Sequence, residues 1–219
     1  MLRIAIDGPG GAGKSTIAKR VASELGLDYI DTGAMYRAIG LKIHRAGIPA
    51  EEGEKLEELL ALTQLDVEGE KIFLDGEDVS EAIRTQEASM YASACSKLPA
   101  VRRELVAMQR RIAEGKGVVM DGRDIGTNVL TDAELKIFLT ADPHVRAKRR
   151  YDQLLAAGKE ADLETVYAET KARDEQDRTR ALNPLAQAED AVLLDSTDLT
   201  IDEVCARIIQ LAKEREAQA

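Results

Sequence analysis

Residues 8–15 read Gly8-Pro9-Gly10-Gly11-Ala12-Gly13-Lys14-Ser15 and match the pattern G-x-x-x-x-G-K-[ST]. The motif follows a short strand pattern over residues 2–6 and leads directly into an amphipathic helical pattern. Glycines let the backbone curl so that successive N–H groups point at phosphate oxygens, and the start of the helix adds further donors. The stretch therefore predicts a loop that binds a nucleoside triphosphate, without indicating what is done with it.

Individual side chains of this loop have expected roles. We expect Lys14 to reach the β- and γ-phosphates as a point charge, and the Ser15 hydroxyl to complete the coordination of Mg²⁺ held by the triphosphate. The alternative is a glycine-rich turn with a solvated lysine, which the strand, the spacing and the helix together disfavour. The residues predicted to bind ATP here are Gly8, Pro9, Gly10, Gly11, Ala12, Gly13, Lys14, Ser15 and Thr16.

The composition limits the classes of protein to consider. A chain of 219 residues, 44% hydrophobic, can form one α/β domain with insertions or two small domains. No apolar run approaches the roughly 20 residues of a membrane span, and the early strand and loop leave no room for a cleavable signal, so a cytoplasmic location is expected. A net charge of −10 disfavours a general nucleic-acid binder.

The cysteines and histidines give no sign of a disulfide or a metal site. Cys95 and Cys205 are far apart and lie in no C-x-x-C motif, so we expect reduced, buried thiols. His44 and His144 lack the spacing of metal ligands and are interpreted as surface or packing residues.

Apolar runs alternate with helical patterns, which is typical of a doubly wound α/β fold. The predicted strands cover residues 3–7, 28–31, 118–121, 135–140 and 191–195. The fold class is therefore a five-stranded parallel sheet with helices on both faces. Several strands end in aspartate, at the sheet edge where ligands of such folds bind: Asp7, Asp31, Asp121 and Asp195.

Two segments interrupt the alternation. An acidic helix predicted over 51–62 and a small β-meander over 65–79 indicate an inserted lobe, assigned to residues 33–99. The charged segment 158–184, nearly free of large apolar residues after Tyr167, is typical of a lid. The core then comprises residues 1–32, 100–157 and 185–219.

Signature residues of other phosphate-loop proteins are missing. The N-K-x-D motif of guanine-reading GTPases is absent, and Asp121 is followed by Gly122 rather than by the glutamate of mechanical ATPases. A small kinase instead needs a second anion site and cations that spread the charge of the transferred phosphoryl group.

Arginines at several separated positions offer the cations of such a second anion site. Arg37 follows the second strand, Arg123 follows the third, and Arg173, Asp177 and Arg180 share one helical face. For each of them an ordinary surface ion pair is the alternative.

Motifs spread along essentially the whole chain resemble those of bacterial cytidylate kinases. They are the phosphate loop, Asp31-Thr32-Gly33-Ala34-Met35-Tyr36-Arg37, Gly122-Arg123-Asp124-Ile125-Gly126-Thr127, and Arg173-Asp174-x-x-Asp177-x-x-Arg180. The resemblance implies phosphoryl transfer from ATP, with Mg²⁺, to CMP or dCMP. It also implies that the insert is the monophosphate-binding lobe and that the lid closes over ATP.

The resemblance further assigns residues to each part of the reaction. It implies that the acceptor phosphate is held by Arg37, Arg123 and Arg180, beside Thr32; the cytosine by Ser93, Arg102 and Asp124; and the ribose by Arg173 and Asp177. Additional ATP contacts are expected from Arg146, Arg150 and Arg178, and the catalytic set is Lys14, Arg123 and Arg180. For Ser93 and Arg102 the alternative is a small-residue helix and a surface arginine. The chain departs from related sequences at Asn128, Thr131 and Gln176, the last of which affects lid electrostatics.

Two other functions stay open at this stage. One is a small kinase for another acceptor, such as UMP, another nucleoside monophosphate or shikimate, although the β-meander argues against most of these. The other is a nucleotide-sensing module without turnover, against which the set of arginines argues. We expect ATP and CMP or dCMP as the only partners, with no nucleic acid and no membrane, and a monomeric protein.

Overall fold

A computed structural model describes residues 1–217 of the chain. The chain forms two compact units. The first contains Met1–Leu27 and the residues from Gly117 onward, and the second contains Asp28–Lys116. The second unit therefore includes residues on both sides of the stretch 33–99 that the sequence predicts as an insert.

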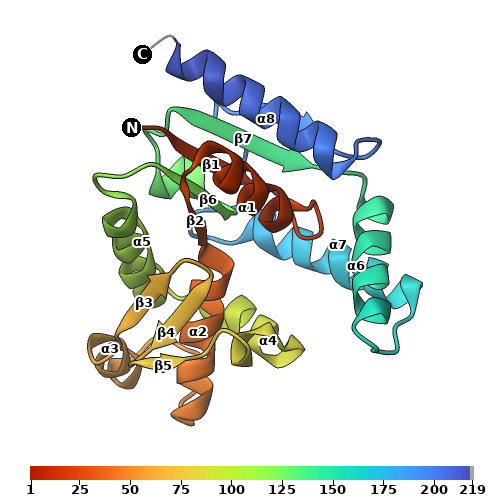
Figure 1. Ribbon diagram of the computed structural model, residues 1–219. Coiled ribbons are helices and arrows are strands. Elements are labelled where there is room, and N and C mark those ends of the chain that lie inside the picture. Colours follow the sequence, from red (N-terminus) through yellow and green to blue (C-terminus); the bar gives the residue numbers. More distant parts are fainter. Residues whose placement is uncertain (218–219) are drawn as a thin grey trace. The chain divides into compact units, whose positions relative to one another are not determined.

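The large sheet is parallel and carries the phosphate loop at the end of its middle strand. Its strands are β1 (Arg3–Asp7), β2 (Asp28–Asp31), β6 (Val118–Gly122), β7 (Leu135–Thr140) and β8 (Val192–Asp195), in the order β2-β6-β1-β7-β8 (Figure 1). In the register, Asp7 pairs with Gly122 on one side and with Phe138 on the other. The predicted α/β fold with a five-stranded parallel sheet is confirmed, and each predicted strand agrees with the observed one to within one residue.

The helices of the first unit begin and end at capping residues that can be read in the sequence. Helix α1 (Lys14–Leu25) ends at Gly26, whose left-handed backbone suits a C-cap. Helix α6 (Pro143–Ala156) is capped by Asp142, whose side chain accepts the N–H of His144. Helix α8 (Ile201–Glu216) opens with a capping box between Thr200 and Glu203.

Helix packing completes the first unit. Helices α1 and α8 contact each other and pack on β6 and β7, respectively (Figure 1). Helix α7 (Leu163–Thr179) lies against α6, and a short π-helical turn, η2 (Ile125–Val129), follows β6. The core comprises fully buried side chains of the central strands and helix α8: Ile4, Ile6, Met120, Leu135, Ile137, Leu139 and Ile208.

The second unit combines helices with a small antiparallel sheet. Its elements after β2 are α2 (Thr32–Arg45), α3 (Glu54–Ala61), β3 (Leu65–Glu68), β4 (Lys71–Leu74), β5 (Glu77–Asp78), η1 (Ala82–Arg84), α4 (Gln86–Cys95) and α5 (Pro99–Ala113). The order β3-β4-β5 confirms the predicted meander. The acidic helix is shorter than the predicted 51–62, because residues 51–53 form a bend and Gly53 caps α3.

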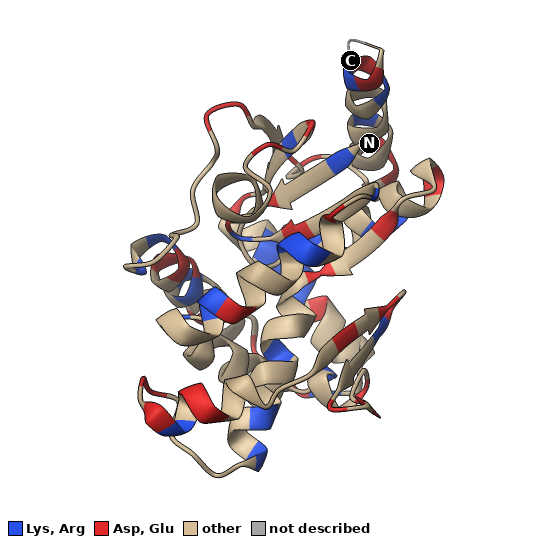
Figure 2. Ribbon diagram, turned by 90° about the vertical axis from the view of Figure 1, so that its left-hand side faces the viewer, with Lys and Arg blue, Asp and Glu red and all other residues tan. Residues whose placement is uncertain are grey.

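Charge is distributed along both units rather than collected in one of them. Acidic and basic residues alternate along the ribbon, with a run of glutamates on and before α3 (Figure 2). Within residues 1–217, no helix combines the length and the apolar character needed to cross a membrane.

Candidate active site

The loop between β1 and α1 has the backbone that the motif predicts. Gly8, Gly11 and Gly13 adopt positive φ angles of 152°, 75° and 90°. At Gly8 a Cβ atom would lie 1.9 Å from the Leu139 carbonyl oxygen, so a residue with a side chain does not fit there. The loop therefore lies directly on β7 at the carboxyl end of the sheet, where ligands of α/β folds bind.

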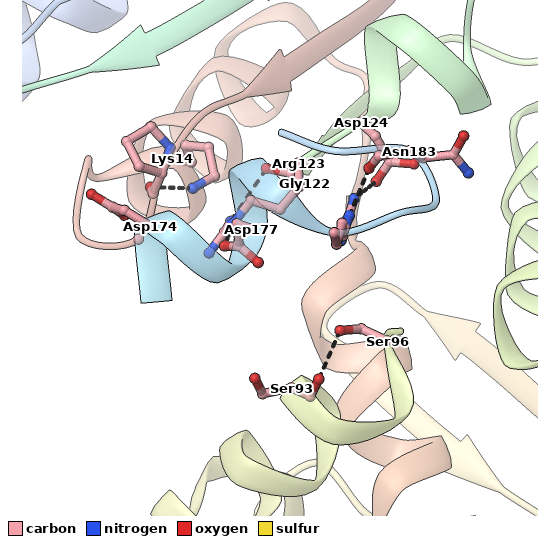
Figure 3. A network of polar contacts seen from close by, with 12 residues as sticks. Lys14, Ser93, Ser96, Gly122, Arg123, Asp124, Asp174, Asp177 and Asn183 are labelled. Carbon is pink, nitrogen blue, oxygen red and sulfur yellow. Dashed lines mark hydrogen bonds and ion pairs between the residues drawn. The ribbon is translucent and has the colours of Figure 1, made fainter. Parts of the chain in front are cut away.

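Lys14 is the cation at the centre of this loop. Its side chain is buried, and its Nζ atom donates a 2.8 Å hydrogen bond to the Pro9 carbonyl across the loop (Figure 3). Burial, together with the nearby Arg123 guanidinium, lowers the pKa of Lys14 from 10.5 to about 7, and the carboxylates of Asp121, Asp7 and Asp177 only partly oppose that shift. A site that disfavours a bare ammonium gains most when a phosphate supplies the missing negative charge.

Ser15 and Asp121 form the part of the loop that fits a magnesium ion. The exposed Ser15 donates its Oγ hydrogen bond to Asp121 Oδ2 at 2.9 Å, so a hydroxyl from α1 and a carboxylate from the end of β6 lie side by side. Hydroxyl, carboxylate and phosphate oxygens are the hard ligands that Mg²⁺ prefers. The residues present therefore fit the ion that a bound triphosphate carries.

Asp7 connects the end of β1 to the turn after β6. Its two carboxylate oxygens accept the N–H groups of Ile125 and Gly126, each at 2.7 Å. Burial raises the pKa of Asp7 to about 6, although these two hydrogen bonds favour the ionised form. The sequence placed Asp7 at a strand end but gave no sign that it would fix the turn that carries Arg123 and Asp124.

Two predicted acceptor arginines of the first unit are held by aspartates (Figure 3). Arg123 donates from Nε to Asp177 at 2.8 Å, and Arg180 donates from Nη2 to Asp124 at 2.9 Å. Both partners of the second pair are buried, with side chains 7% exposed. The first unit thus brings Arg123, Asp124, Asp177 and Arg180 together as two ion pairs.

The surroundings of Asp124 add one further contact. Its second carboxylate oxygen accepts a 3.0 Å hydrogen bond from the Asn128 side chain, one of the positions where this chain departs from related sequences. Arg180 also donates from Nε to the Asn183 carbonyl at 2.6 Å (Figure 3). Both contacts orient the groups of this ion pair.

In the second unit, Arg37 is held over the first turn of its own helix. Asp31 caps α2 by accepting the Ala34 N–H at 2.9 Å with one oxygen, and it accepts Arg37 Nη2 at 3.0 Å with the other. A Cβ on Gly33 would lie 3.1 Å from both Arg37 Nη1 and Asp31 Oδ1, so only glycine lets the guanidinium approach without a displacement. Thr32, the neighbouring predicted residue, is buried at the same helix start.

Ser93 and Arg102 also lie in the second unit. Arg102 is 3% exposed, lies 5.8 Å from the Tyr36 ring centroid and donates from Nη1 to the Ser96 carbonyl at 3.3 Å. The Ser96 hydroxyl in turn donates to the Ser93 carbonyl at 3.1 Å (Figure 3). The interpretation of Arg102 as a solvated surface arginine is therefore wrong, while its role in reading cytosine stays a prediction.

The remaining predicted residues differ in their accessibility. Thr16, Arg150, Arg173 and Arg178 are exposed, whereas Arg146 is buried and hydrogen-bonded to other parts of the first unit. The aspartates that hold Arg37 and Arg146, which are Asp31 and Asp174, were not among the predicted site residues. Their only sequence signal was a carboxylate at a strand end or beside a predicted site residue.

The cysteines and histidines take the structural places expected of them. Cys95 and Cys205 are free and buried, and burial raises the pKa of Cys95 to about 12, so its thiol stays protonated. His44 stacks on Tyr91 and His144 on Tyr167, with ring centroids 4.3 and 4.0 Å apart. Within residues 1–217, histidine, cysteine and carboxylate side chains form no cluster of three that could hold a metal ion.

The parallel sheet carries the phosphate loop with Lys14 after β1, and Asp121 lies at the end of the neighbouring strand β6. This arrangement defines a P-loop nucleotide-binding protein. The family model described as "Cytidylate kinase" matches residues 4–214, and the chain belongs to that family.

Comparisons with individual proteins agree with this assignment. The chain is 53% identical over 214 residues to a cytidylate kinase of Caldicellulosiruptor bescii, covering 96% of this chain and 95% of that protein. It is 48% identical over 213 residues to a cytidylate kinase of Mycobacterium leprae, covering 97% and 96%. Among solved structures, an uncharacterized protein from Eubacterium ventriosum is similar in fold, with a TM-score of 0.55, 14% identity, and coverage of 97% and 99%.

Proposed function

We propose that the protein transfers the γ-phosphoryl group of ATP to CMP or dCMP, giving ADP and CDP or dCDP. The observation that carries this proposal is the family match over residues 4–214, in a chain whose phosphate loop keeps the lysine and the glycine backbone that phosphate binding needs. Cytidylate kinase is also the printed name of relatives that are about half identical over nearly the whole chain.

ATP binds at the phosphate loop in this proposal. The loop amides and Lys14 hold the β- and γ-phosphates, while Thr16 and the exposed Arg150 and Arg178 lie on the ATP side, together with Arg146 behind the loop. Ser15 and Asp121 hold the magnesium ion, which neutralises charge on the transferred group when it is bound. Residues 158–184 form the lid that excludes water, the competing acceptor.

CMP binds with its phosphate toward the loop. Arg37, Arg123 and Arg180 hold the acceptor phosphate beside Thr32, because guanidinium groups bind phosphate oxygens bidentately. Asp124, Ser93 and Arg102 read the cytosine, where a carboxylate accepts from the exocyclic amino group, and Arg173 with Asp177 holds the ribose. The predicted boundaries of the lobe (33–99), the lid (158–184) and the core (1–32, 100–157, 185–219) belong to this proposal.

Catalysis then needs no protein nucleophile. A phosphate oxygen of CMP attacks the γ-phosphorus of ATP in line, and because that oxygen is largely ionised near neutral pH, no general base is required. Lys14, Arg123 and Arg180 act by positioning the two nucleotides and by stabilising the charge of the transition state. We further propose a cytoplasmic monomer that acts on these small molecules and not on nucleic acid.

An ADP-release assay over a set of acceptors tests the proposal. The purified protein is incubated with ATP and Mg²⁺ and with CMP, dCMP, UMP, AMP or shikimate in turn, and ADP is quantified. We expect fast ADP release only with CMP or dCMP. Preference for UMP or shikimate would establish one of the other kinases, and binding of ATP and CMP without ADP release would indicate a sensing module.

A matched variant ties the activity to the loop. Lys14→Ala removes the ammonium that stabilises the transferred group, and we expect turnover to fall by about 10²–10³-fold, as for loss of one preorganised charge-stabilising donor, with CMP affinity nearly unchanged. Turnover within about twofold of the wild type would remove Lys14 from the mechanism.

A further inference from the structure

Arg146, on helix α6, is one of the most deeply buried charged residues of the described chain. It is 2% exposed. Its guanidinium donates four hydrogen bonds, all to the first unit: to the carboxylate of Asp174 at 3.1 and 2.6 Å, to the carbonyl of Gly10 at 3.0 Å, and to the carbonyl of Ala141 at 2.8 Å. These bonds use four of the five N–H groups of the guanidinium, so only one is left for a phosphate.

Asp174 supplies the charge that allows Arg146 to be buried. Its side chain, on α7, is 11% exposed and accepts both guanidinium arms in the bidentate geometry that makes such pairs strong. Removing one partner of a buried pair leaves the other charge uncompensated, which is far more costly than removing both. The Arg146–Asp174 ion pair therefore joins α6 to α7, and replacing either residue alone would leave an unpaired buried charge.

The Nη1 atom of Arg146, which also binds Asp174, donates its second hydrogen bond to the phosphate loop, at the Gly10 carbonyl. Because the peptide group is planar and trans, fixing the Gly10 carbonyl toward Arg146 makes the Gly11 N–H point away from it. The loop also rests on α6 directly, since a Cβ on Gly11 would lie 3.0 Å from the Arg146 carbonyl oxygen and 3.1 Å from its Cβ. Arg146 therefore fixes both the distance of the Gly10–Gly11 peptide from α6 and the direction in which its N–H group points.

We propose that Arg146 is a positioning residue for the phosphate loop, not a phosphate ligand, and that Asp174 is the residue that holds Arg146 in place. The inference rests on the proposed function, in which this loop binds the phosphates of ATP. It makes the geometry of the loop depend on a side chain of α7, the helix inside the predicted lid.

If Arg146 were instead a phosphate ligand, Asp174→Asn would change nucleotide affinity in the opposite direction. If Arg146 were a phosphate ligand that Asp174 occupies in the absence of nucleotide, Asp174→Asn would release it and tighten nucleotide binding. If Arg146 positions the loop, the same substitution loosens the Gly10 peptide and weakens binding. The direction of the change therefore separates the two roles.

Calorimetric titration with ADP and Mg²⁺ measures this direction. We expect Asp174→Asn to weaken ADP binding by about ten- to a hundredfold, the range expected when a binding group is misplaced by up to about 1 Å. The matched control is Asp152→Asn, which removes the exposed Lys148–Asp152 pair from the same α6 helix and should leave ADP affinity unchanged. Unchanged or tighter binding by Asp174→Asn would overturn the proposal.

Two further measurements separate positioning from general loss of stability. Amide hydrogen exchange of the nucleotide-free protein should show faster exchange within residues 10–13 of Asp174→Asn, with wild-type protection in the strands β1 and β7. Equal exchange of the loop in both proteins would contradict the coupling. The double variant Arg146→Met/Asp174→Leu removes both charges and should recover thermal stability while ADP affinity stays low, since the Gly10 carbonyl still lacks its donor. Recovery of wild-type ADP affinity would overturn the role of Arg146.

The failure of this inference can be told apart from a failure of the proposed function. If the wild type binds neither ADP nor ATP, the proposed function is wrong. The exchange experiment needs no nucleotide, so it tests the link between Asp174 and the loop in either case.

Discussion

The tightest backbone contact of the phosphate loop predicts a large effect from a single methyl group. In Gly8→Ala the new Cβ would lie 1.9 Å from the carbonyl oxygen of Leu139, whereas real Cβ atoms essentially never approach a heavy atom within 3.0 Å. Either the loop or strand β7 must therefore move by more than 1 Å. Neither side is a flexible side chain, because the contact joins backbone to backbone.

The free energy follows from two costs that add at Gly8. Forcing extra atoms into a packed site costs about 1–3 kcal/mol. The φ angle of 152° is one that residues with a Cβ rarely adopt, which adds about 1–2 kcal/mol. We therefore expect Gly8→Ala to lower the free energy of unfolding by about 2–5 kcal/mol, a large part of the roughly 5–15 kcal/mol of a typical domain.

Gly10→Ala is the matched control in the same loop. The nearest atom to a Cβ there is Arg123 Nη2 at 3.7 Å, an ordinary contact, and Gly10 does not have a positive φ angle. Alanine at such a position is neutral or stabilises by up to about 1 kcal/mol, because it restricts the unfolded chain. Urea unfolding followed by circular dichroism measures both variants. If Gly8→Ala lowered the free energy of unfolding by less than about 1 kcal/mol and so behaved like Gly10→Ala, the steric argument would be refuted.

The remaining predictions concern titration and base reading. Because the folded-state pKa of Asp7, about 6, lies above its ordinary value of 3.8, the folded protein binds the extra proton as the pH falls. Stability should therefore gain about 1 kcal/mol from this group between pH 7 and 5, and urea unfolding of Asp7→Asn should lack that gain; parallel pH profiles would contradict it. Because Lys14 has a pKa of about 7 in the free protein, ADP binding at pH 8 should take up as much as about one proton, measured by calorimetry in buffers of different ionisation enthalpy. Equal uptake in Lys14→Met would assign the proton to another group. Asp124→Asn should weaken discrimination between CMP and UMP in the kinetic assay, and an unchanged ratio would mean that the base is read elsewhere.

Local rules were sufficient to predict most of the fold. The strand ends at Asp7 and Asp31 depend on a few neighbouring residues, and the structure places both where the sequence indicated. The helix start at Pro99 and the capping box at Thr200 depend on equally local signals. The β-meander could also be predicted, because its turns fall at Gly69 and Gly76, both of which have positive φ angles.

The partners of the site residues could not be predicted, because they depend on packing between distant segments. Asp7 binds the turn at Ile125, 118 residues away in the sequence. Arg146 can be buried because it pairs with Asp174, which lies 28 residues further along the chain. From the sequence, both Arg146 and Arg150 of α6 were expected to contact ATP. Only the burial of both groups shows that one of these arginines faces the loop.

Under the proposed function, the pairing of arginines with aspartates bears on the choice of substrate. At rest, Arg123 and Arg180 are neutralised by Asp177 and Asp124, the same carboxylates that the proposed function assigns to the sugar and the base. If the proposed function is correct, a nucleoside that draws these carboxylates to its sugar and base frees two guanidinium groups for its own phosphate. On the same proposal, inorganic phosphate, which has neither sugar nor base, meets arginines that are still paired with aspartates, so the acceptor site favours a nucleotide over the free anion.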